Sequence, residues 1–266
     1  MSVPDLPLSV CIITRNEEEK LPDCLDSVEW AREVIVVDDF STDATPEVCR
    51  AYSNVSYHRR RLEGFGFQKA HAVNLAANDW ILSLDADERV SPELRDEIAG
   101  VVAEPAGQAG FCVRLRHFWF GTTQLDSYPG GLRLFRKSRG NFGPYYVHEK
   151  VDLEGPVGQL EEFLLHYPRS GEDFSSYYQK YVGLYSPLAA RDYFARGRRV
   201  TVLNSFWQLI MIPLLVFGRD YLVKRKFRQG RIGLYVSVCA ALSYQRSYWQ
   251  LIWLQRRPRR EEEEST

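Results

Sequence analysis

The first half of the chain alternates short apolar runs with segments of helical spacing, and this alternation limits the possible folds more than any other feature. The runs Leu8–Thr14, Glu33–Val37, Val55–His58 and Trp80–Leu84 predict buried strands. The helical segments stand around Leu21–Val28, from Thr45, around Gln68–Ala77 and from Ser91. Strands that alternate with helices predict an α/β fold, with a mostly parallel sheet and helices on both of its faces.

Acidic side chains stand where two of the predicted strands end. Asp38 and Asp39 end one strand, and Asp85 and Asp87 follow another. Ligands of such sheets lie beyond the carboxyl ends of the strands. If the backbone stays extended, Asp85 and Asp87 point the same way, and two such carboxylates repel unless a cation lies between them. Mg²⁺ or Mn²⁺ suits oxygen ligands and phosphates. The alternative is a helix-capping acid beside a solvated one.

Other polar residues share this edge of the predicted sheet. Thr14, Arg15 and Glu17 follow the first strand, and they either line a nucleotide pocket or cap the next helix. Asp39 is suited to accept hydrogen bonds from a ribose or a base, and its alternative role is an Asx turn.

The segment Gly64–Lys69 predicts a flexible turn that ends in two polar side chains, Gln68 and Lys69. Lys69 is a candidate for contact with a diphosphate. The alternative is a solvated lysine.

The second half of the chain changes character. Tyr128–Arg136 predicts a glycine loop that enters a strand, and Val151–His166 predicts a hairpin. Glu172–Arg196 predicts a helix with an aromatic stripe. Val202–Phe217 is strongly apolar but shorter than the roughly 20 residues that a membrane-spanning helix needs, and Ile232–Leu242 is shorter still. We expect amphipathic helices that lie at an interface.

The charges are divided along the chain, although the net charge is only −1. From Phe174 to Arg260 there are 16 Lys and Arg but only two acids, Asp192 and Asp220. This basic, aromatic part predicts contact with the anionic surface of an inner membrane; the alternative is a soluble helical cap. Nucleic acid is a poorer match, because the apolar runs are too long for a basic groove.

The predicted organisation is a catalytic domain over residues 1–170, a membrane-associating helical region over 171–256 and a charged tail over 257–266. The five cysteines are scattered, without metal-ligand spacing, which favours a reducing compartment. The first residues do not follow the pattern of a signal peptide. We therefore expect a cytoplasmic protein that binds peripherally to the cytoplasmic face of the inner membrane.

Three segments carry a family resemblance: Ser9–Glu17, Val36–Asp43 and Leu82–Glu88. With their spacing, the chain resembles glycosyltransferase family 2, whose members have the Rossmann-like GT-A fold. Gly64–Lys69 and the segments Arg133–Arg136, Val147–Glu149 and Leu165–Tyr167 narrow the resemblance to a bacterial subgroup. That subgroup includes lipopolysaccharide core glucosyltransferases that act on heptose. Phe40 stands where relatives carry a small residue.

The resemblance implies a role for each matching residue. It places Thr14, Arg15, Glu17 and Asp39 around the base and ribose of the donor, and Asp85 near the ribose and the metal. Asp87 is implied as a direct ligand of Mg²⁺ or Mn²⁺, and His166 as a group near the metal and the diphosphate. Glu149 is implied as the general base, and Asp126 is a rival for that role. The remaining candidates for substrate binding are Asp38, Gln68, Lys69, Gly130, Gly131 and Arg133.

The function implied is an inverting transfer of a sugar from a nucleotide-sugar, with UDP as the expected nucleotide. The acceptor implied is a glycan or a lipid-linked molecule of cell-envelope polysaccharide or lipopolysaccharide core synthesis. Two alternatives stay open. One is a nucleotidyltransferase that makes nucleotide-sugars, although Thr14–Glu17 is not the glycine-rich phosphate loop that such an enzyme usually needs. The other is a non-catalytic, membrane-associated protein that binds nucleotide-sugars.

Overall fold

The computed structural model describes residues 6–104, 106–119, 122–128, 131–147, 149–167 and 173–256. The chain divides into two compact units, residues 1–171 and 172–266. The predicted charged tail, residues 257–266, and the candidate Gly130 lie outside the described residues.

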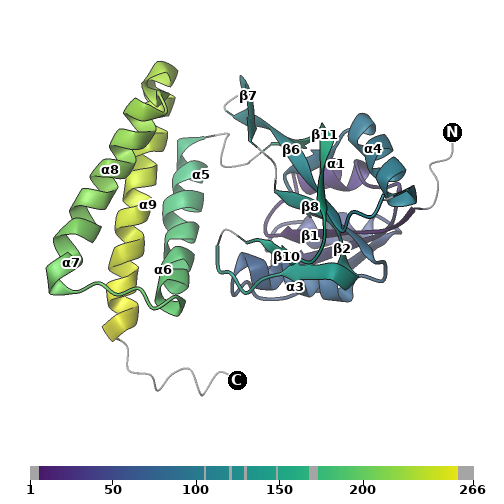
Figure 1. Cartoon of the computed structure of the whole chain (residues 1–266), viewed down its shortest axis with the longest axis horizontal. Coiled ribbons are helices and arrows are strands. Elements are labelled where there is room, and N and C mark those ends of the chain that lie inside the picture. Colours follow the sequence, from purple (N-terminus) through teal and green to yellow (C-terminus); the bar gives the residue numbers. More distant parts are fainter. Residues whose placement is uncertain are drawn as a thin grey trace. The chain divides into compact units, whose positions relative to one another are not determined.

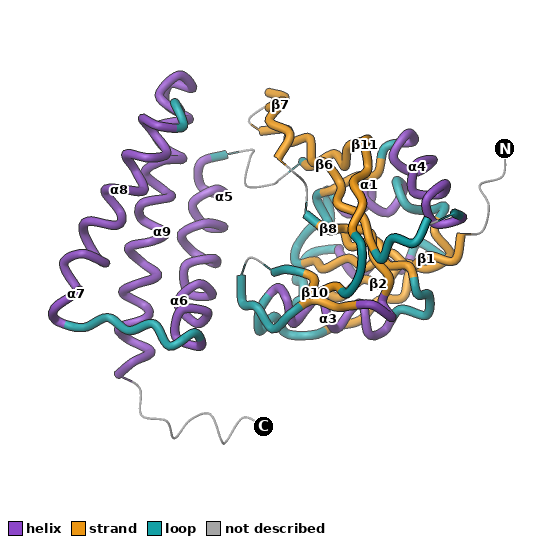
Figure 2. Tube along the Cα trace, in the orientation of Figure 1, coloured by secondary structure: helices purple, strands orange, loops and turns teal. Residues whose placement is uncertain are grey.

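The first unit is built on a nine-stranded sheet (Figures 1 and 2). Its order is β3-β2-β1-β4-β8-β6-β11-β5, and β7 pairs with β6 off this path. The strands are β1 Leu6–Thr14, β2 Ala31–Asp38, β3 Val55–Arg59, β4 Trp80–Asp85, β5 Glu88–Val90, β6 Gly110–Trp119, β7 Thr122–Tyr128, β8 Leu132–Arg136 and β11 Val157–His166. β1 pairs in parallel with β2 and β4, and β2 pairs in parallel with β3. The parallel sheet expected from the first half is therefore present.

Helices cover both faces of this sheet, because successive strand residues point to opposite sides. Val10 of β1 shares a buried cluster with Leu21 of α1 and Leu94 of α4, whereas Cys11 shares another with Val73 of α3. Figure 1 shows α1 and α4 on one side and α3 on the other. The helices of this unit are α1 Leu21–Asp26, α2 Thr45–Arg50, α3 Phe65–Leu75 and α4 Pro92–Ala103.

Two local predictions were wrong. The turn expected over Gly64–Lys69 is already helical from Phe65, with Gly64 as the N-cap. Val151–His166 is not a hairpin: β10 (Val151–Leu153) pairs with β9 (Gly140–Phe142) in a separate two-stranded sheet. β11 joins the large sheet instead, parallel to β6 and antiparallel to β5. Apolar alternation along a strand does not specify which neighbour that strand pairs with.

Over residues 173–256, the second unit consists of three helical rods. The first joins α5 (Phe174–Tyr178), the π-helical turn η3 (Gln179–Leu184) and α6 (Tyr185–Ala195). The second joins α7 (Val202–Phe206), η4 (Trp207–Met211), α8 (Ile212–Gly218) and η5 (Arg219–Val223). After the short η6 (Lys226–Gln229) comes the third, α9 (Gly230–Arg256). α9 packs against both α6 and α8.

Both apolar segments of this unit are longer than the sequence pattern predicts. Helical structure continues from Val202 to Val223, which is 22 residues with a mean hydropathy of 1.4. By length and composition alone, this is the one helix in the described part of the chain that is both long and apolar enough to cross a membrane. The expected helix Ile232–Leu242 is the middle of the 27-residue α9. The polar residues that interrupt the apolar pattern are compatible with a continuous helix, so they do not mark its ends.

Candidate active site

The strand register brings the predicted site residues to one edge of the sheet. Thr14 lies opposite Asp38 on the neighbouring β2, and Ile13 lies opposite Asp85 on β4. Three parallel strands therefore end together, and their carboxyl ends present Thr14, Asp38 and Asp85 at one edge. This edge is where α/β sheets bind ligands.

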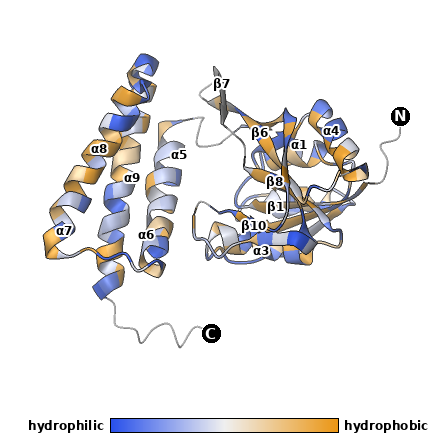
Figure 3. Ribbon diagram, in the orientation of Figure 1, coloured by the Kyte–Doolittle hydropathy of each residue, from blue (hydrophilic) through white to orange (hydrophobic). Residues whose placement is uncertain are grey.

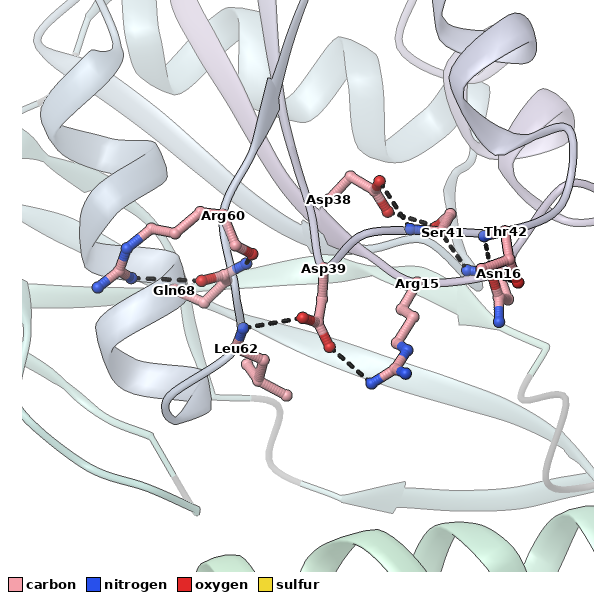
Figure 4. Close-up of polar contacts among 9 residues, drawn as sticks. All are labelled: Arg15, Asn16, Asp38, Asp39, Ser41, Thr42, Arg60, Leu62 and Gln68. Carbon is pink, nitrogen blue, oxygen red and sulfur yellow. Dashed lines mark hydrogen bonds and ion pairs between the residues drawn. The ribbon is translucent and has the colours of Figure 1, made fainter. Parts of the chain in front are cut away.

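Asp39 is the centre of a polar cluster at this edge (Figure 4). Its Oδ2 lies 2.8 Å from Nη1 of Arg15, and its Oδ1 accepts a 2.9 Å hydrogen bond from the Leu62 backbone N–H. Arg15 is largely exposed, whereas Asp39 is buried except for a small part of its surface. The pair thus has a fixed carboxylate and a guanidinium that faces solvent.

Asp38 has a different role from the predicted contact with a substrate. Its side chain is fully buried. The carboxylate accepts hydrogen bonds from the Ser41 backbone N–H at 2.9 Å, from the Ser41 hydroxyl and from the Tyr57 hydroxyl at 2.6 Å. Asp38 therefore holds the turn after β2, and it presents no surface to a ligand.

Gln68 is likewise buried and paired with protein groups. Its side-chain amide donates to the backbone carbonyl of Arg60 at 2.8 Å, and its oxygen accepts from Arg60 Nη1 at 3.3 Å (Figure 4). Arg60, which Gln68 holds by these hydrogen bonds, lies two residues before Leu62, whose backbone N–H donates to Asp39. Gln68 thus acts on the Asp39 cluster indirectly, and direct contact with a substrate is not supported.

The loop after β1 is held against the loop after β2. The Asn16 N–H donates to the Ser41 hydroxyl at 2.8 Å, and the Glu17 N–H donates to the Thr45 hydroxyl at 3.0 Å. The Thr14 hydroxyl is buried and has no hydrogen-bond partner within the described segments. A buried polar atom of this kind is uncommon, so a ligand group beside Thr14 would satisfy it.

Lys69 joins two predicted site residues that are far apart in sequence. Its Nζ lies 2.8 Å from Asp85 Oδ1 and 2.7 Å from Glu149 Oε1, and its side chain is almost completely buried. Burial opposes the charged form, but the carboxylates of Asp85 and Glu149 outweigh burial and raise the pKa of Lys69. Lys69 is therefore a permanent cation between two carboxylates, and not the solvated lysine of the alternative interpretation.

A second cation lies on the other side of Asp85. Arg133 Nη2 lies 3.6 Å from Asp85 Oδ2 and 2.6 Å from Glu88 Oε1. Burial alone would raise the pKa of Asp85, but Lys69 and Arg133 outweigh it and hold this pKa well below its usual range. Asp85 is thus ionised, and its carboxylate lies between two protein cations.

Glu88 belongs to this charged cluster, although the sequence pattern did not single it out. It is 1% exposed, pairs with Arg133 and accepts a 2.9 Å hydrogen bond from the Asp85 backbone N–H. Its position directly after Asp87, in a segment bounded by apolar residues, was the available signal. Glu88 holds the turn that separates Asp85 from Asp87.

Ala86 and Asp87 form a turn between β4 and β5, so Asp85 and Asp87 are not alternate residues of one extended strand, as was expected from the sequence. Asp87 lies beside His166, with 3.3 Å between Asp87 Oδ2 and His166 Nε2. The antiparallel pairing of β5 with β11 puts His166 opposite Glu88 and so beside this turn. Within the described ranges, no three His, Cys, Asp or Glu residues are grouped as a metal site.

The fit of Mg²⁺ or Mn²⁺ can be judged from this donor set. One carboxylate and one imidazole lie together at Asp87 and His166. Mg²⁺ commonly takes one or two protein ligands and completes its shell with waters and substrate phosphates. The pair therefore fits a cation that is shared with a diphosphate.

Glu149 is positioned through contacts between its own segment and the start of α3. The Phe65 N–H donates to the Tyr146 carbonyl at 3.1 Å, and the Gly66 N–H donates to the Tyr145 carbonyl at 2.9 Å. A Cβ on Gly66 would lie 2.4 Å from the Gly143 carbonyl oxygen, so this approach requires glycine. The same helix carries Lys69, so α3 orients both partners of the Lys69–Glu149 pair.

The acceptor-side candidates are described only in part. Asp126 lies in β7, of which the structure describes the backbone at this position. Gly131 is exposed, and its carbonyl accepts a 3.2 Å hydrogen bond from Val113. Asp126 and Gly131 therefore stay predictions for this site.

A comparison with protein-family models matches residues 9–145 to the family described as Glycosyl transferase family 2. The chain belongs to this family. The matched range contains Thr14, Asp39, Lys69, Asp85 and Arg133, so the charged edge of the sheet lies within the part that defines the family. Membership makes this protein a glycosyltransferase.

Curated relatives extend the likeness to nearly the whole chain. The chain is 30% identical over 261 residues to the lipopolysaccharide core biosynthesis glycosyltransferase LpsC of Rhizobium meliloti, covering 92% of this chain and 94% of that one. It is 27% identical over 251 residues to an uncharacterized glycosyltransferase of Rickettsia typhi, covering 89% and 83%.

Solved structures confirm the predicted GT-A fold. The mannosyltransferase PcManGT of Pyrobaculum calidifontis, in complex with GDP-Man and Mn²⁺, has a TM-score of 0.54 at 13% identity, with 94% of this chain and 88% of that one covered. TarS 1–349 of S. aureus, in complex with UDP-GlcNAc, has a TM-score of 0.50 at 16% identity, with 91% of each chain covered. These likenesses concern the fold.

Proposed function

We propose that this glycosyltransferase moves a sugar from a UDP-sugar to a glycan or lipid-linked acceptor in lipopolysaccharide core synthesis, with inversion at the anomeric carbon. The observation that carries the proposal is the position of Lys69 between Asp85 and Glu149. Lys69 joins Asp85, at the end of the sheet where the donor would bind, to Glu149, the candidate base, in one charge network. The core-synthesis role of LpsC supports the substrate class.

The donor would bind across the ends of β1 and β2. Asp39, held by Arg15 and by the Leu62 N–H, offers carboxylate oxygens to a base edge or a ribose hydroxyl. The buried Thr14 hydroxyl lies at the same strand end and would gain a partner when a nucleotide binds. Arg15 and Glu17 complete this proposed pocket.

The diphosphate would lie near Asp85 and Asp87. Asp87 and His166 would hold Mg²⁺ or Mn²⁺, and the bound cation would neutralise charge on the leaving nucleoside diphosphate. Lys69 and Arg133 keep Asp85 ionised and fixed, so this carboxylate can accept hydrogen bonds from the donor sugar or ribose. We propose Asp85 as a substrate-binding residue and Asp87 as the direct metal ligand.

Glu149 would act as the general base. It would accept the proton of the acceptor hydroxyl as that oxygen attacks the anomeric carbon opposite the leaving group. The Lys69 ammonium, 2.7 Å away, would hold the Glu149 carboxylate in position. One displacement of this kind inverts the configuration and needs no covalent intermediate. Asp126 is the rival base.

The acceptor side and the location of the enzyme are proposed from the second unit. Its basic residues and exposed apolar helices suit the cytoplasmic face of the inner membrane, where a lipid-linked acceptor would lie. We therefore propose a peripheral cytoplasmic enzyme whose residues 1–170 catalyse the transfer and whose residues 171–256 associate with the membrane.

The test measures UDP release from a panel of UDP-sugars, with and without Mn²⁺, in the presence of membrane extracts that supply acceptors. We expect transfer that depends on Mn²⁺ or Mg²⁺ and on one donor. Asp87→Ala should abolish metal-stimulated transfer while the protein stays folded. Transfer that survives unchanged in this variant would contradict the metal assignment.

The same assay separates the two alternatives. A nucleotidyltransferase would release pyrophosphate from UTP and a sugar phosphate instead of releasing UDP from a UDP-sugar. A non-catalytic binding protein would bind a UDP-sugar without turnover for any acceptor.

A further inference from the structure

The helical unit exposes large apolar side chains on two of its rods, Val202–Val223 and α9. Figure 3 colours many residues of α7 and α8 as hydrophobic. On the rod Val202–Val223, only 11% of the most apolar window is buried. Leu203, Phe206, Trp207 and Leu214 of this rod are 97%, 63%, 53% and 59% exposed. Water-exposed apolar surface of this extent indicates a site that another apolar phase covers.

α9 exposes a second apolar stripe on one side. Its exposed large apolar residues are Leu234, Val238, Leu242, Trp249 and Trp253. At about 100° per residue, these five fall within about 100° of the helix circumference. The buried residues of α9, such as Gly233, Ser237 and Leu251, lie on the opposite side. The stripe is therefore a continuous surface of one helix.

Basic residues bracket this stripe. Arg231 and Arg256 are both exposed, and by the same helical count both fall inside the arc of the stripe, one near each end. Lys224 and Arg225 are also exposed just before α9. Apolar residues along the stripe, two tryptophans toward its C-terminal end and an arginine near each end match a bilayer with anionic headgroups, whereas a protein partner would not require this charge pattern.

The packing of the three rods argues against a membrane crossing. Gln245 of α9 donates to the Leu209 carbonyl at 3.2 Å, so the next residue of α9, the exposed Arg246, lies at about the level of Leu209. Leu209 is about 10 Å along that rod, which is well inside a hydrocarbon core of about 30 Å if the rod spans it. A crossing would therefore bring Arg246 into the hydrocarbon beside this position.

The first rod brings a further charge to the same level. Tyr193 of α6 stacks on Tyr248 of α9 with 5.6 Å between ring centroids, and Arg191, two residues before Tyr193, is exposed. Because α9 packs against both other rods, all three must enter a membrane together. Ionised side chains at this depth are strongly disfavoured.

We infer that the helical unit is a monotopic membrane-binding module, which lies in the headgroup region with its exposed apolar stripes buried among the acyl chains of an anionic bilayer, and which does not cross it. The role of the module, which is to keep the enzyme beside a lipid-linked acceptor, rests on the proposed function. The stripes and the arginines carry the inference themselves.

The test is flotation of the full chain with phosphatidylcholine vesicles, with and without phosphatidylglycerol. We expect binding that increases with phosphatidylglycerol, weakens with salt and is reversed by alkaline carbonate, as for a peripheral protein. Trp249→Ser with Trp253→Ser should weaken binding by about tenfold or more, because both side chains lose apolar burial. Arg231→Gln with Arg256→Gln should weaken binding to the anionic vesicles by about fivefold for each charge and leave zwitterionic vesicles unaffected.

Leu75→Ser with Val157→Ser is the matched control, since these residues are exposed apolar positions of the first unit. This control should bind vesicles like the parent. Circular dichroism and thermal unfolding of each variant must match the parent before its binding is compared. Resistance to carbonate would show a crossing and overturn the inference. The inference would also be overturned if the tryptophan variant bound vesicles like the parent. It would be overturned as well if the two substitutions changed only the oligomeric state, because the stripe would then be an interface with a second copy of the chain.

Donor turnover separates this inference from the proposed function. With a detergent-solubilised membrane extract as the source of acceptor and no vesicles, the tryptophan variant should still release UDP from the donor at the parent rate. Vesicle binding without any UDP release in the presence of this acceptor source would contradict the proposed function and leave the membrane module standing.

Discussion

The ammonium of Lys69 lies 2.7 Å from the Glu149 carboxylate, although 80 positions separate the two residues in the sequence. The same ammonium lies 2.8 Å from Asp85. The helix that carries Lys69 thus joins the end of β4 to the segment that follows β9. This relationship makes the charge state of the site a property of three residues together.

Lys69→Met should destabilise the protein and nearly abolish transfer. Removing one partner of a buried ion pair lowers the free energy of unfolding by about 3–5 kcal/mol. Because the side chains of Asp85 and Glu149 are 34% and 22% exposed to solvent, we expect a smaller loss of about 2–3 kcal/mol. Urea unfolding measures this difference. Lys150→Met, at an exposed lysine beside Glu149, is the control and should change the free energy of unfolding by less than about 0.5 kcal/mol. An equal effect of both variants would contradict the buried role of Lys69.

Glu149→Gln should lower kcat by about 10²- to 10⁴-fold, because it removes a base while keeping the shape of the side chain. Donor binding should change little, so calorimetric titration with UDP provides the internal reference. Asp126→Asn tests the rival, and we expect it to lower kcat by less than about tenfold. The reverse order of the two effects would transfer the base role to Asp126.

The contribution of Lys69 to the free energy of unfolding depends on pH through two pKa shifts, those of Asp85 and Lys69. Folding lowers the pKa of Asp85, so the ionised carboxylate stabilises the folded protein above its pKa in the unfolded chain, about 3.9. This stabilisation is lost as the pH falls through the pKa of Asp85 in the folded protein. Folding raises the pKa of Lys69, so its ammonium stabilises the folded protein below the lysine pKa of the unfolded chain, about 10.4. This stabilisation is lost as the pH rises through the pKa of Lys69 in the folded protein. The stability difference between the parent and Lys69→Met should therefore be level from about pH 6 to 9 and shrink below about pH 4. A difference that changes steadily between pH 6 and 9 would show another group titrating in the pair.

Phe40 has a backbone φ of 51°, which an aromatic residue rarely adopts, and its ring contacts the Arg59 guanidinium at 4.7 Å. Phe40→Asn and Phe40→Ala both remove the ring contact, but asparagine tolerates the left-handed conformation better. We expect Phe40→Asn to be more stable than Phe40→Ala by about 0.5–1 kcal/mol in thermal or urea unfolding. Equal stability of the two variants would mean that the backbone at position 40 relaxes when the ring is removed.

Gly66→Ala should disturb the site through the backbone. The added Cβ would lie 2.4 Å from the Gly143 carbonyl oxygen and 2.9 Å from the Tyr145 N, so the segment leading to Glu149 must move. We expect a loss of about 1–3 kcal/mol in the free energy of unfolding, together with a lower kcat.

Gly100→Ala is the matched control, because a Cβ there meets nothing within 4 Å and the residue lies in α4. This variant should be neutral or more stable by up to about 1 kcal/mol, with unchanged kcat. If Gly66→Ala behaved in the same way, the close approach at the start of α3 would be unnecessary for activity.

The sequence by itself determined the alternating α/β fold and the family. Its apolar periodicity specified which strand residues are buried, and the positions of Asp39, Asp85 and Asp87 after apolar runs specified a charged edge. These features are local, because each depends on residues close together in the chain. The resemblance also pointed to Glu149 and His166, which lie far from that edge in sequence.

Only the tertiary structure decided what each polar residue contacts. Asp38 and Asp39 are neighbours in sequence, yet Asp38 is fully buried against Ser41 and Tyr57 while Asp39 faces Arg15. Glu88 became a site residue because Arg133 lies beside it, and β11 joined β5 instead of pairing with β10. These outcomes depend on which distant segments meet, and short-range spacing carries no information about that. The physical reason is that burial and charge pairing act across the folded chain, whereas periodicity reports only the local backbone.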